Sequence, residues 1–340
     1  MMSPYRLADC HLHFEGSLPP ETLASLARRA GHRFADLVVF EAERSQVADA
    51  KGFLSLYAEV CGLFRSPRDY GEAAAAIARS LGDGGVSYAE IYVSPEIAAR
   101  LRLDPEACLV EIDRAFRGVE AEGGTRCRIL LDTVRQWGPE SAERVLDLHE
   151  RTRLDSVAGF GLGGDETAVP ASAFAGIYLR ARALGLRTSV HAGEWGGVQS
   201  LTESLDALRP DRIDHGIAAA EDPRLLERLA EEATVLWVAP TSNVVTGAVG
   251  SLEEHPLPRL LDAGVRVAIG ADDPLFFRST TIGELRVVKE TFGFGARTMR
   301  LLAENSWHGA FCSEAERRVA LSDLAARPRR RGRDQPSVFS

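Results

Sequence analysis

Short apolar runs alternate with longer segments of helical periodicity along most of the chain. The helical segments span residues 139–152, 171–184, 223–232 and 257–263, and several have glycine or Asp-Pro turn signals at their edges. Strands with intervening helices predict an α/β fold, a parallel (β/α)8 TIM barrel. An open doubly wound sheet is the alternative, but the chain lacks the glycine-rich phosphate fingerprint of such sheets. The predicted strands are residues 8–13, 86–93, 125–132, 157–162, 187–191, 212–215, 234–238 and 265–269.

A long segment separates the first two predicted strands, and its periodicity predicts extra helices. A normal connection from strand to helix has only a few residues, whereas residues 20–81 have mostly helical periodicity. An apolar stripe runs through this insertion at i, i+3, i+4 spacing. It either packs the extra helices onto the barrel or covers the barrel mouth as an apolar wall for a flat substrate. The stripe consists of Phe53, Leu56, Tyr57, Val60 and Phe64.

The composition excludes several classes of partner. The formal net charge of -9 argues against binding to a nucleic-acid backbone, which needs a basic face. There is no apolar leader segment and no run of about 18 apolar residues, so we expect neither export nor a membrane anchor. The 5 cysteines are scattered without CxxC pairs. That usage predicts a reducing, cytoplasmic location and argues against a thiolate zinc site.

The chain is long enough for one large barrel domain with a sizeable core. We expect residues 1–327 to form that domain, including the helical insertion. Residues 328–340 are basic and lack apolar periodicity, which is typical of a disordered tail.

Several predicted strands end in residues that can bind a metal or move a proton. Catalytic groups of barrels lie at the C-terminal strand ends. His11 and His13 are two residues apart on a strand, so their side chains point to the same face. His191 ends another strand and is followed by Gly193, which permits close approach of a substrate, and by Glu194. Imidazole suits zinc and similar divalent ions, although core histidines and a surface glutamate are the plainer interpretation of each residue alone.

Two further strand ends carry the same kind of chemistry. His215 ends the predicted strand 212–215 and could accept a proton from a metal-bound water. Asp272 and Asp273 follow the last strand, and two adjacent carboxylates repel each other when buried. A metal on one and a substrate hydrogen bond on the other would relieve that repulsion. A core histidine and solvated loop acids are the alternatives.

Taken in order, these stretches resemble the adenosine deaminase family of zinc aminohydrolases, within the amidohydrolase superfamily. Each piece alone is unspecific, but the ordered set is highly specific. The matching stretches are residues 11–18 (HLHFEGSL), 85–95 (GVSYAEIYVSP), 163–166 (GGDE), 191–194 (HAGE), 215–216 (HG), 240–243 (PTSN) and 271–274 (ADDP).

The resemblance implies a hydrolytic deaminase of a 6-aminopurine nucleoside, with adenosine or deoxyadenosine as the substrate. Glu194 resembles the acid that protonates the ring nitrogen beside the attacked carbon, and this role requires a carboxyl group with a raised pKa. His215 resembles the group that positions and deprotonates the attacking water. One zinc ion per chain is implied, and another divalent ion is an alternative. The implied ligands are His11, His13, His191 and Asp272.

The resemblance also implies contacts to the substrate. Asp273 resembles the carboxylate on the far side of the purine, and Gly164 resembles a backbone donor to a ring nitrogen. Glu15 occupies the place of an acid near the sugar. The chain departs from the family at Ala239, where cysteine is usual, and at Ala271, where a hydroxyl residue is usual. Both departures could alter the pocket.

Several alternatives remain at this stage. Residues 163–166 look more like nucleoside deaminases than like the adenine-specific branch, while aminodeoxyfutalosine, adenine and N6-substituted adenine are other candidate substrates. A binuclear amidohydrolase is less favoured, because no lysine that could be carboxylated lies between Lys51 and Lys289. A catalytically silent purine-binding protein with the same barrel is the alternative from another class.

Overall fold

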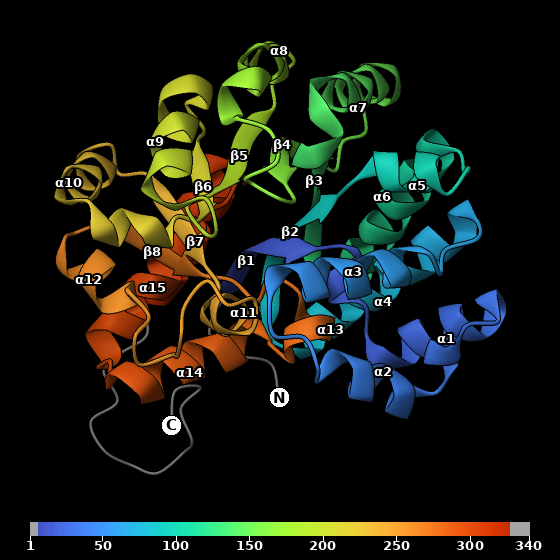
Figure 1. Ribbon diagram of the computed structural model, residues 1–340, viewed down its shortest axis with the longest axis horizontal. Helices are drawn as coiled ribbons and strands as arrows, with labels where there is room; N and C mark the ends of the chain where they lie inside the picture. Colours follow the sequence, from blue (N-terminus) through green and yellow to red (C-terminus); the bar gives the residue numbers. More distant parts are fainter. Residues whose placement is uncertain (1–5, 327–340) are drawn as a thin grey trace.

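The computed structural model describes residues 6–326, so the predicted tail at 328–340 lies outside the described residues. One sheet of 8 parallel strands follows the order of the sequence (Figure 1). The strands begin and end within two residues of their predicted bounds. They are β1 Leu7–His13, β2 Val86–Val93, β3 Arg126–Val134, β4 Val157–Gly163, β5 Arg187–Ala192, β6 Arg212–His215, β7 Val235–Val238 and β8 Arg266–Ile269.

The sheet closes on itself where the end of β8 meets β1. Asp272 donates its backbone N–H to the carbonyl of His11 at 2.8 Å, and His13 donates to the carbonyl of Asp272 at 3.1 Å. Leu12 and Asp272 form a parallel bridge at the same point. The predicted (β/α)8 barrel is therefore confirmed, and its closure joins two segments that carry predicted site residues.

Helices surround the barrel (Figure 1). The predicted helix 171–184 is divided into a short 3-10 turn and α8, while the other predicted helices keep nearly the same bounds. No helix among residues 6–326 is long and apolar enough to cross a membrane. After the insertion, the helices are α5 Pro95–Arg100, α6 Pro105–Ala121, α7 Gly138–Thr152, α8 Ala175–Ala183, α9 Gly197–Leu208, α10 Pro223–Glu231, α11 Pro240–Val245, α12 Leu257–Asp262, α13 Pro274–Phe277, α14 Thr281–Phe292, α15 Ala296–Gly309 and α16 Glu314–Ala326. The short 3-10 turns are η1 Glu15–Ser17, η2 Arg33–Ala35, η3 Arg135–Trp137, η4 Ala171–Phe174 and η5 Ile217–Glu221.

The extra helices lie between β1 and β2, as the sequence predicts. Part of their apolar stripe packs the helices onto the barrel and part lines the barrel mouth, while contact with a flat substrate stays a prediction. Val60 and Phe64 are buried in the core, whereas Phe53 and Tyr57 line a cavity at the barrel mouth. The helices of this insertion are α1 Pro20–Ala30, α2 Leu37–Arg44, α3 Ala50–Cys61 and α4 Pro67–Asp83.

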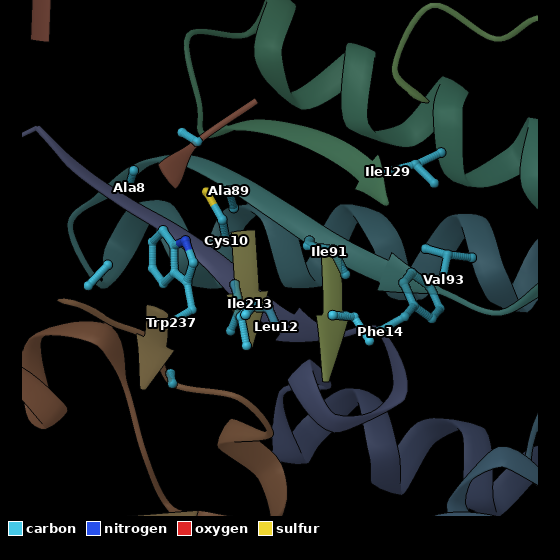
Figure 2. Close-up of a cluster of buried hydrophobic side chains, with 14 of the residues drawn as sticks. Ala8, Cys10, Leu12, Phe14, Ala89, Ile91, Val93, Ile129, Ile213 and Trp237 are labelled. Atoms are coloured by element: carbon cyan, nitrogen blue, oxygen red, sulfur yellow. The ribbon is translucent and has the colours of Figure 1, made fainter. Parts of the chain in front are cut away.

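Successive side chains of β1 alternate between the hydrophobic core and the interior of the barrel. Ala8, Cys10 and Leu12 are fully buried in an apolar cluster with Ile91 of β2 (Figure 2). Burying a leucine or isoleucine side chain contributes about 1.5–3 kcal/mol. Because successive side chains of a strand point to opposite faces, the intervening His11 is directed into the barrel.

A buried ion pair fills the N-terminal half of the barrel. Arg212, the first residue of β6, pairs with Glu90 of β2, and both side chains are completely buried. The guanidinium also donates to the carbonyl of Cys10 at 2.9 Å and stacks on Phe311 at 4.1 Å. These contacts compensate for the desolvation of the two charges. His215 is the last residue of the same strand, so the polar groups at the C-terminal end of β6 face the barrel mouth.

Candidate metal centre and active site

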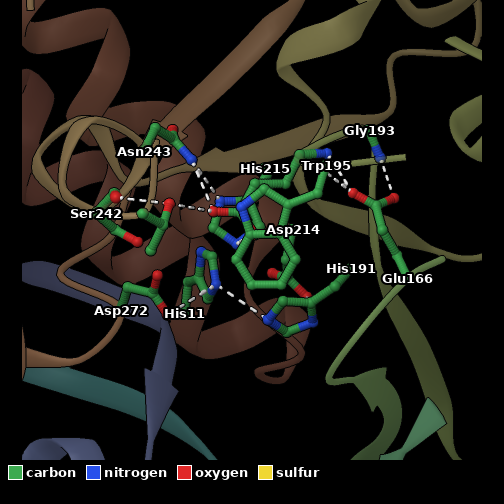
Figure 3. Close-up of polar contacts among 12 residues, drawn as sticks. His11, Glu166, His191, Gly193, Trp195, Asp214, His215, Ser242, Asn243 and Asp272 are labelled. Carbon is green, nitrogen blue, oxygen red and sulfur yellow. Dashed lines mark hydrogen bonds and ion pairs between the residues drawn. The ribbon is translucent and has the colours of Figure 1, made fainter. Parts of the chain in front are cut away.

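Three imidazoles and a carboxylate meet inside the barrel. The Nε2 atom of His191 lies 3.3 Å from Nε2 of His11 and 3.1 Å from Nε2 of His13. The Oδ1 atom of Asp272 lies 3.4 Å from Nε2 of His11 and 3.3 Å from Nε2 of His13. Because β1 and β5 are four strands apart, the contact between their histidines crosses the barrel interior (Figure 3). These four residues are called the His-Asp cluster below.

The His-Asp cluster fits a divalent cation. Its three Nε2 atoms face one another, and each neutral imidazole has only one N–H to share. Burial lowers the pKa of His191 to about 3, so its ring is neutral and has a free lone pair. Burial would raise the pKa of Asp272, but His11 and the other histidines hold it well below its usual value. Burial lowers the pKa of His13, but Asp273 and Asp272 raise it to about 10, so this ring would release a proton when an ion binds. Neutral imidazoles and an ionised carboxylate are the ligands that zinc and similar ions prefer.

Two residues at the strand ends have a backbone conformation that L residues rarely adopt. The φ angle is +64° at His215 and +59° at Asp272. Such conformations cost about 1–3 kcal/mol and persist where surrounding contacts hold them. Asp272 is held by its two hydrogen bonds to β1. Both strained residues lie at strand ends that direct side chains into the site.

Glu194 lies in the turn after β5, and only 5% of its side chain is exposed. Its Oε1 accepts a hydrogen bond from Nδ2 of Asn243 at 3.2 Å, and its Oε2 lies 3.3 Å from Nε2 of His215. Burial, together with the negative charges of Asp272 and Glu166, raises the pKa of Glu194 well above its usual value. The protonated form therefore persists to higher pH than in an ordinary glutamate, and that form can donate a proton.

A second glutamate, Glu166, holds the turn that carries Glu194. Its carboxylate accepts the backbone N–H groups of Gly193 and Glu194, each at 2.8 Å, and that of Trp195 (Figure 3). It also accepts the hydroxyl hydrogen of Ser200 at 2.6 Å. Three consecutive N–H groups directed at one carboxylate fix the path of the chain past the His-Asp cluster.

A Glu166→Gln variant is expected to be less stable and less active. The new amide would present N–H hydrogens to backbone donors, so buried groups would lose their partners at a cost of about 1–3 kcal/mol. Urea unfolding and the kcat for ammonia release measure the two effects. Glu231→Gln changes an exposed glutamate and serves as the control. Equal stability and kcat in both variants would remove Glu166 from this role.

Two buried groups that sequence analysis missed lie beside His191. Asp214 lies with Oδ2 at 3.8 Å from Nδ1 of His191 and accepts the hydroxyl hydrogen of Ser189 at 2.6 Å. Arg135 donates to the carbonyl of His191 at 2.9 Å and to that of Glu166 at 3.1 Å. The sequence offered only weak signals for them, namely the place of Asp214 before His215 and that of Arg135 just after β3.

A cavity of about 320 Å³ opens above the His-Asp cluster. Glu194 and His215 line it on one side, and α3 of the insertion lines the other. All predicted site residues except His11 contact it, while His11 lies behind His191. Among residues 6–326, its lining does not include Ala239 or Ala271, so these two departures from the family do not form its wall.

The predicted substrate contacts lie around this cavity. Asp273 is 2% exposed, its Oδ1 has no hydrogen-bond partner, and burial beside Asp272 raises its pKa well above the usual value. Glu15 accepts the hydroxyl hydrogen of Tyr57 at 2.9 Å, and burial raises its pKa to about 7. Gly164 has a φ of +84°, and a Cβ there would overlap a neighbouring side chain. A side chain at position 164 would therefore strain the backbone and crowd the site.

A model of a protein family described as adenosine deaminase matches residues 6–327. The chain belongs to the adenosine deaminase family. It is therefore a hydrolase that acts on C–N bonds in cyclic amidines. This membership agrees with the presence of a protonatable glutamate and a metal-binding cluster in one cavity.

Three relatives in the family illustrate its range. An adenine deaminase of Chelativorans sp. (strain BNC1) is 35% identical over 317 residues, covering 93% of this chain and 97% of the relative. An aminodeoxyfutalosine deaminase of Streptomyces avermitilis is 36% identical over 318 residues, covering 91% and 87%. The crystal structure of an adenine deaminase from Arthrobacter aurescens superposes with a TM-score of 0.88 at 32% identity, covering 94% and 98% of the two chains. The family thus includes enzymes named for a free base and for a larger compound.

Proposed function

We propose that this protein deaminates a 6-aminopurine nucleoside, with adenosine or deoxyadenosine as substrate and inosine or deoxyinosine plus ammonia as products. The observation that carries the proposal is the position of Glu194. A buried carboxyl group with a raised pKa lies beside the His-Asp cluster on the wall of one cavity. Hydrolysis of an aromatic C–N bond needs an acid and an activated water at such a place.

The proposed ligands of one zinc ion are His11, His13, His191 and Asp272, and another divalent ion would fit the same donors. His215 also brings a ring nitrogen within 4.8 Å of the donor atoms of His11, His191 and Asp272. When bound, such an ion lowers the pKa of a water molecule to about 7 and so supplies a nucleophile near neutral pH. His215 has its ring 4.6 Å from that of His11 and positions the attacking water. The positive charge of such an ion would also keep Asp272 ionised in its buried site.

Glu194 supplies the proton that the ring needs. Attack of water at C6 breaks the aromaticity of the purine, and negative charge then develops on the neighbouring ring nitrogen. A neutral carboxyl group that faces this nitrogen neutralises the charge as it forms. The enclosed surroundings of Glu194 raise its pKa, which keeps the proton available until substrate binds.

The remaining polar groups of the cavity orient the substrate. Asp273, with an unpartnered Oδ1, would contact the far side of the purine, and the backbone of Gly164 would contact a ring nitrogen. Glu15 and Tyr57 would contact the sugar. Tyr92 stacks on His13 with ring centroids 5.0 Å apart and limits the depth to which the ring can enter.

A bulkier aminopurine nucleoside is the second candidate substrate. The outer cavity is lined by Ile97, Leu101 and Trp137, and Arg100 stacks on Trp137 at 3.9 Å. Arg100 is the only lysine or arginine among the described residues that line the cavity. This apolar wall with one cation has room and charge for a substituent beyond the purine. Aminodeoxyfutalosine, which names the Streptomyces avermitilis relative, belongs in that class.

A panel of aminopurines tests the proposal. Ammonia release by the metal-loaded protein is measured with adenine, adenosine, deoxyadenosine and aminodeoxyfutalosine. We expect a kcat/KM for the nucleosides at least about 10-fold above that for adenine, because the cavity extends past the base. The highest value with adenine would assign the protein to the free base, as for the relatives named adenine deaminase. Binding of purines without turnover of any would favour a silent binding protein.

A further inference from the structure

His255 is a buried histidine that has no part in the proposed function. It lies between α11 and α12 and is 2% exposed. Its Nδ1 accepts the backbone N–H of Leu257 at 3.1 Å, and its Nε2 lies 3.2 Å from Oδ1 of Asn243. A backbone N–H can only donate, so Nδ1 carries no proton and Nε2 must carry the proton of the neutral ring. Burial lowers the pKa of His255 to about 4, in agreement with a neutral ring.

This fixed tautomer determines how the side chain of Asn243 is oriented. Nε2 of His255 donates, so the oxygen of the Asn243 amide must face it, and the nitrogen must face the other way. Nδ2 of Asn243 then has two hydrogens for two acceptors. These are Oε1 of Glu194 at 3.2 Å and Nδ1 of His215 at 3.1 Å (Figure 3). Asn243 is fully buried, so water does not supply substitute partners.

The orientation of Asn243 in turn distinguishes the two oxygens of Glu194. In a protonated carboxyl group, the carbonyl oxygen is the better acceptor and the other oxygen carries the hydrogen. Oε1 therefore serves as the acceptor oxygen for Asn243. Nδ1 of His215 also accepts from Asn243, so the hydrogen of that neutral ring is on Nε2, which lies 3.3 Å from Oε2 of Glu194. The hydroxyl of Thr246 lies 3.3 Å from Oε1 but also donates to the carbonyl of Ser242 at 2.9 Å, so it does not decide the matter.

We propose that His255 is a positioning residue that acts through Asn243 to keep an N–H donor on Oε1 of Glu194 and the ring hydrogen of His215 on Nε2, beside the same carboxyl group. The proposal rests on the acid role of Glu194 in the proposed function. Without His255, the amide of Asn243 could rotate by half a turn. Its oxygen would then face Oε1 of Glu194 and the Nδ1 lone pair of His215, so one of these two groups would have to direct a hydrogen toward Asn243.

Two substitutions of His255 separate positioning from mere packing. In His255→Gln, the side-chain amide can place an N–H near the former Nε2 and can still donate to Asn243. In His255→Leu, the donor is lost while the volume is nearly kept. We expect kcat to stay within about 3-fold of wild type for the glutamine variant. For the leucine variant we expect it to fall by about 10- to 10²-fold, with KM nearly unchanged, a part of what a general acid contributes.

A double variant tests whether His255 acts through Asn243. In an Asn243→Ala background, adding His255→Leu is expected to lower kcat no further, because the relay is already broken. His308→Gln, at an exposed histidine, is the matched control. A leucine variant with wild-type kcat, a glutamine variant as slow as the leucine variant, or additive losses in the double variant would each overturn the proposal.

A spectroscopic readout keeps the test independent of turnover. The ring nitrogen chemical shifts of His255 in the wild-type protein should show a neutral ring with hydrogen on Nε2 at pH 7. Hydrogen on Nδ1 would overturn the relay even if the enzyme is active. If the protein releases no ammonia from any aminopurine while His255 has the expected tautomer, the proposed function fails and the hydrogen-bond relay stands.

Discussion

A Glu194→Gln variant is expected to keep its bound metal and to lose about 10²- to 10⁴-fold in kcat, the contribution of a general acid. Glutamine has nearly the same shape and can still accept the hydrogen bond from Asn243 through its carbonyl oxygen. It has no acidic proton for the ring nitrogen, so charge would build there without neutralisation. Ammonia release and metal content, measured on the same preparation, separate the loss of the acid from loss of the site.

The pH dependence gives a second signature of the same group. Burial raises the pKa of Glu194, so the protonated form persists to higher pH than for an ordinary glutamate. The kcat of the wild type should therefore fall only on the alkaline side of that raised pKa, where the proton is lost. The residual activity of Glu194→Gln should lack this alkaline loss. Glu231→Gln, at an exposed position, should match the wild type. Full turnover by Glu194→Gln would refute the acid role.

The strands and the positions of the site residues could be predicted because they depend on local patterns. Each strand is a short apolar run, and its end is marked by a polar or glycine-containing turn. The barrel then brings the strand ends together, so His11 and His191 could be placed in one site although 180 positions separate them. Membership in the adenosine deaminase family agrees with this result, since the family model spans residues 6–327 and so includes all these strand ends.

The hydrogen bonds that orient the site could not be predicted in the same way. Glu166 reaches three backbone N–H groups of another loop, and nothing in its local sequence specifies a partner 27 or more positions away. His255 contacts Asn243 through a loop conformation that periodicity does not describe. Arg135 likewise binds two carbonyl groups, which are present at every residue and leave no trace in sequence. Such contacts follow only from the folded arrangement of the loops.

A His11→Ala variant is expected to lose its bound metal and, with it, essentially all turnover. His11 is completely buried, and its Nε2 is one of the donors that face the centre of the His-Asp cluster. With one imidazole removed, the remaining donors cannot complete the four-ligand set that zinc prefers. Metal analysis after dialysis measures the loss directly. His308→Ala removes an exposed histidine and should keep the wild-type stoichiometry.

Thermal unfolding adds a test that does not depend on activity. A metal that binds only the folded chain stabilises it in proportion to the logarithm of its concentration over Kd, so a chelator should lower the Tm of the wild type. It should leave the Tm of His11→Ala unchanged, because no ion remains to be withdrawn. His13→Ala is a second variant at a partly exposed position, in case the cavity left by His11→Ala prevents folding. If both variants keep the wild-type metal content and a Tm that the chelator still lowers, the ion must be bound elsewhere. The His-Asp cluster would then be a buried hydrogen-bond network, and the close approach of its ring nitrogens would need another explanation.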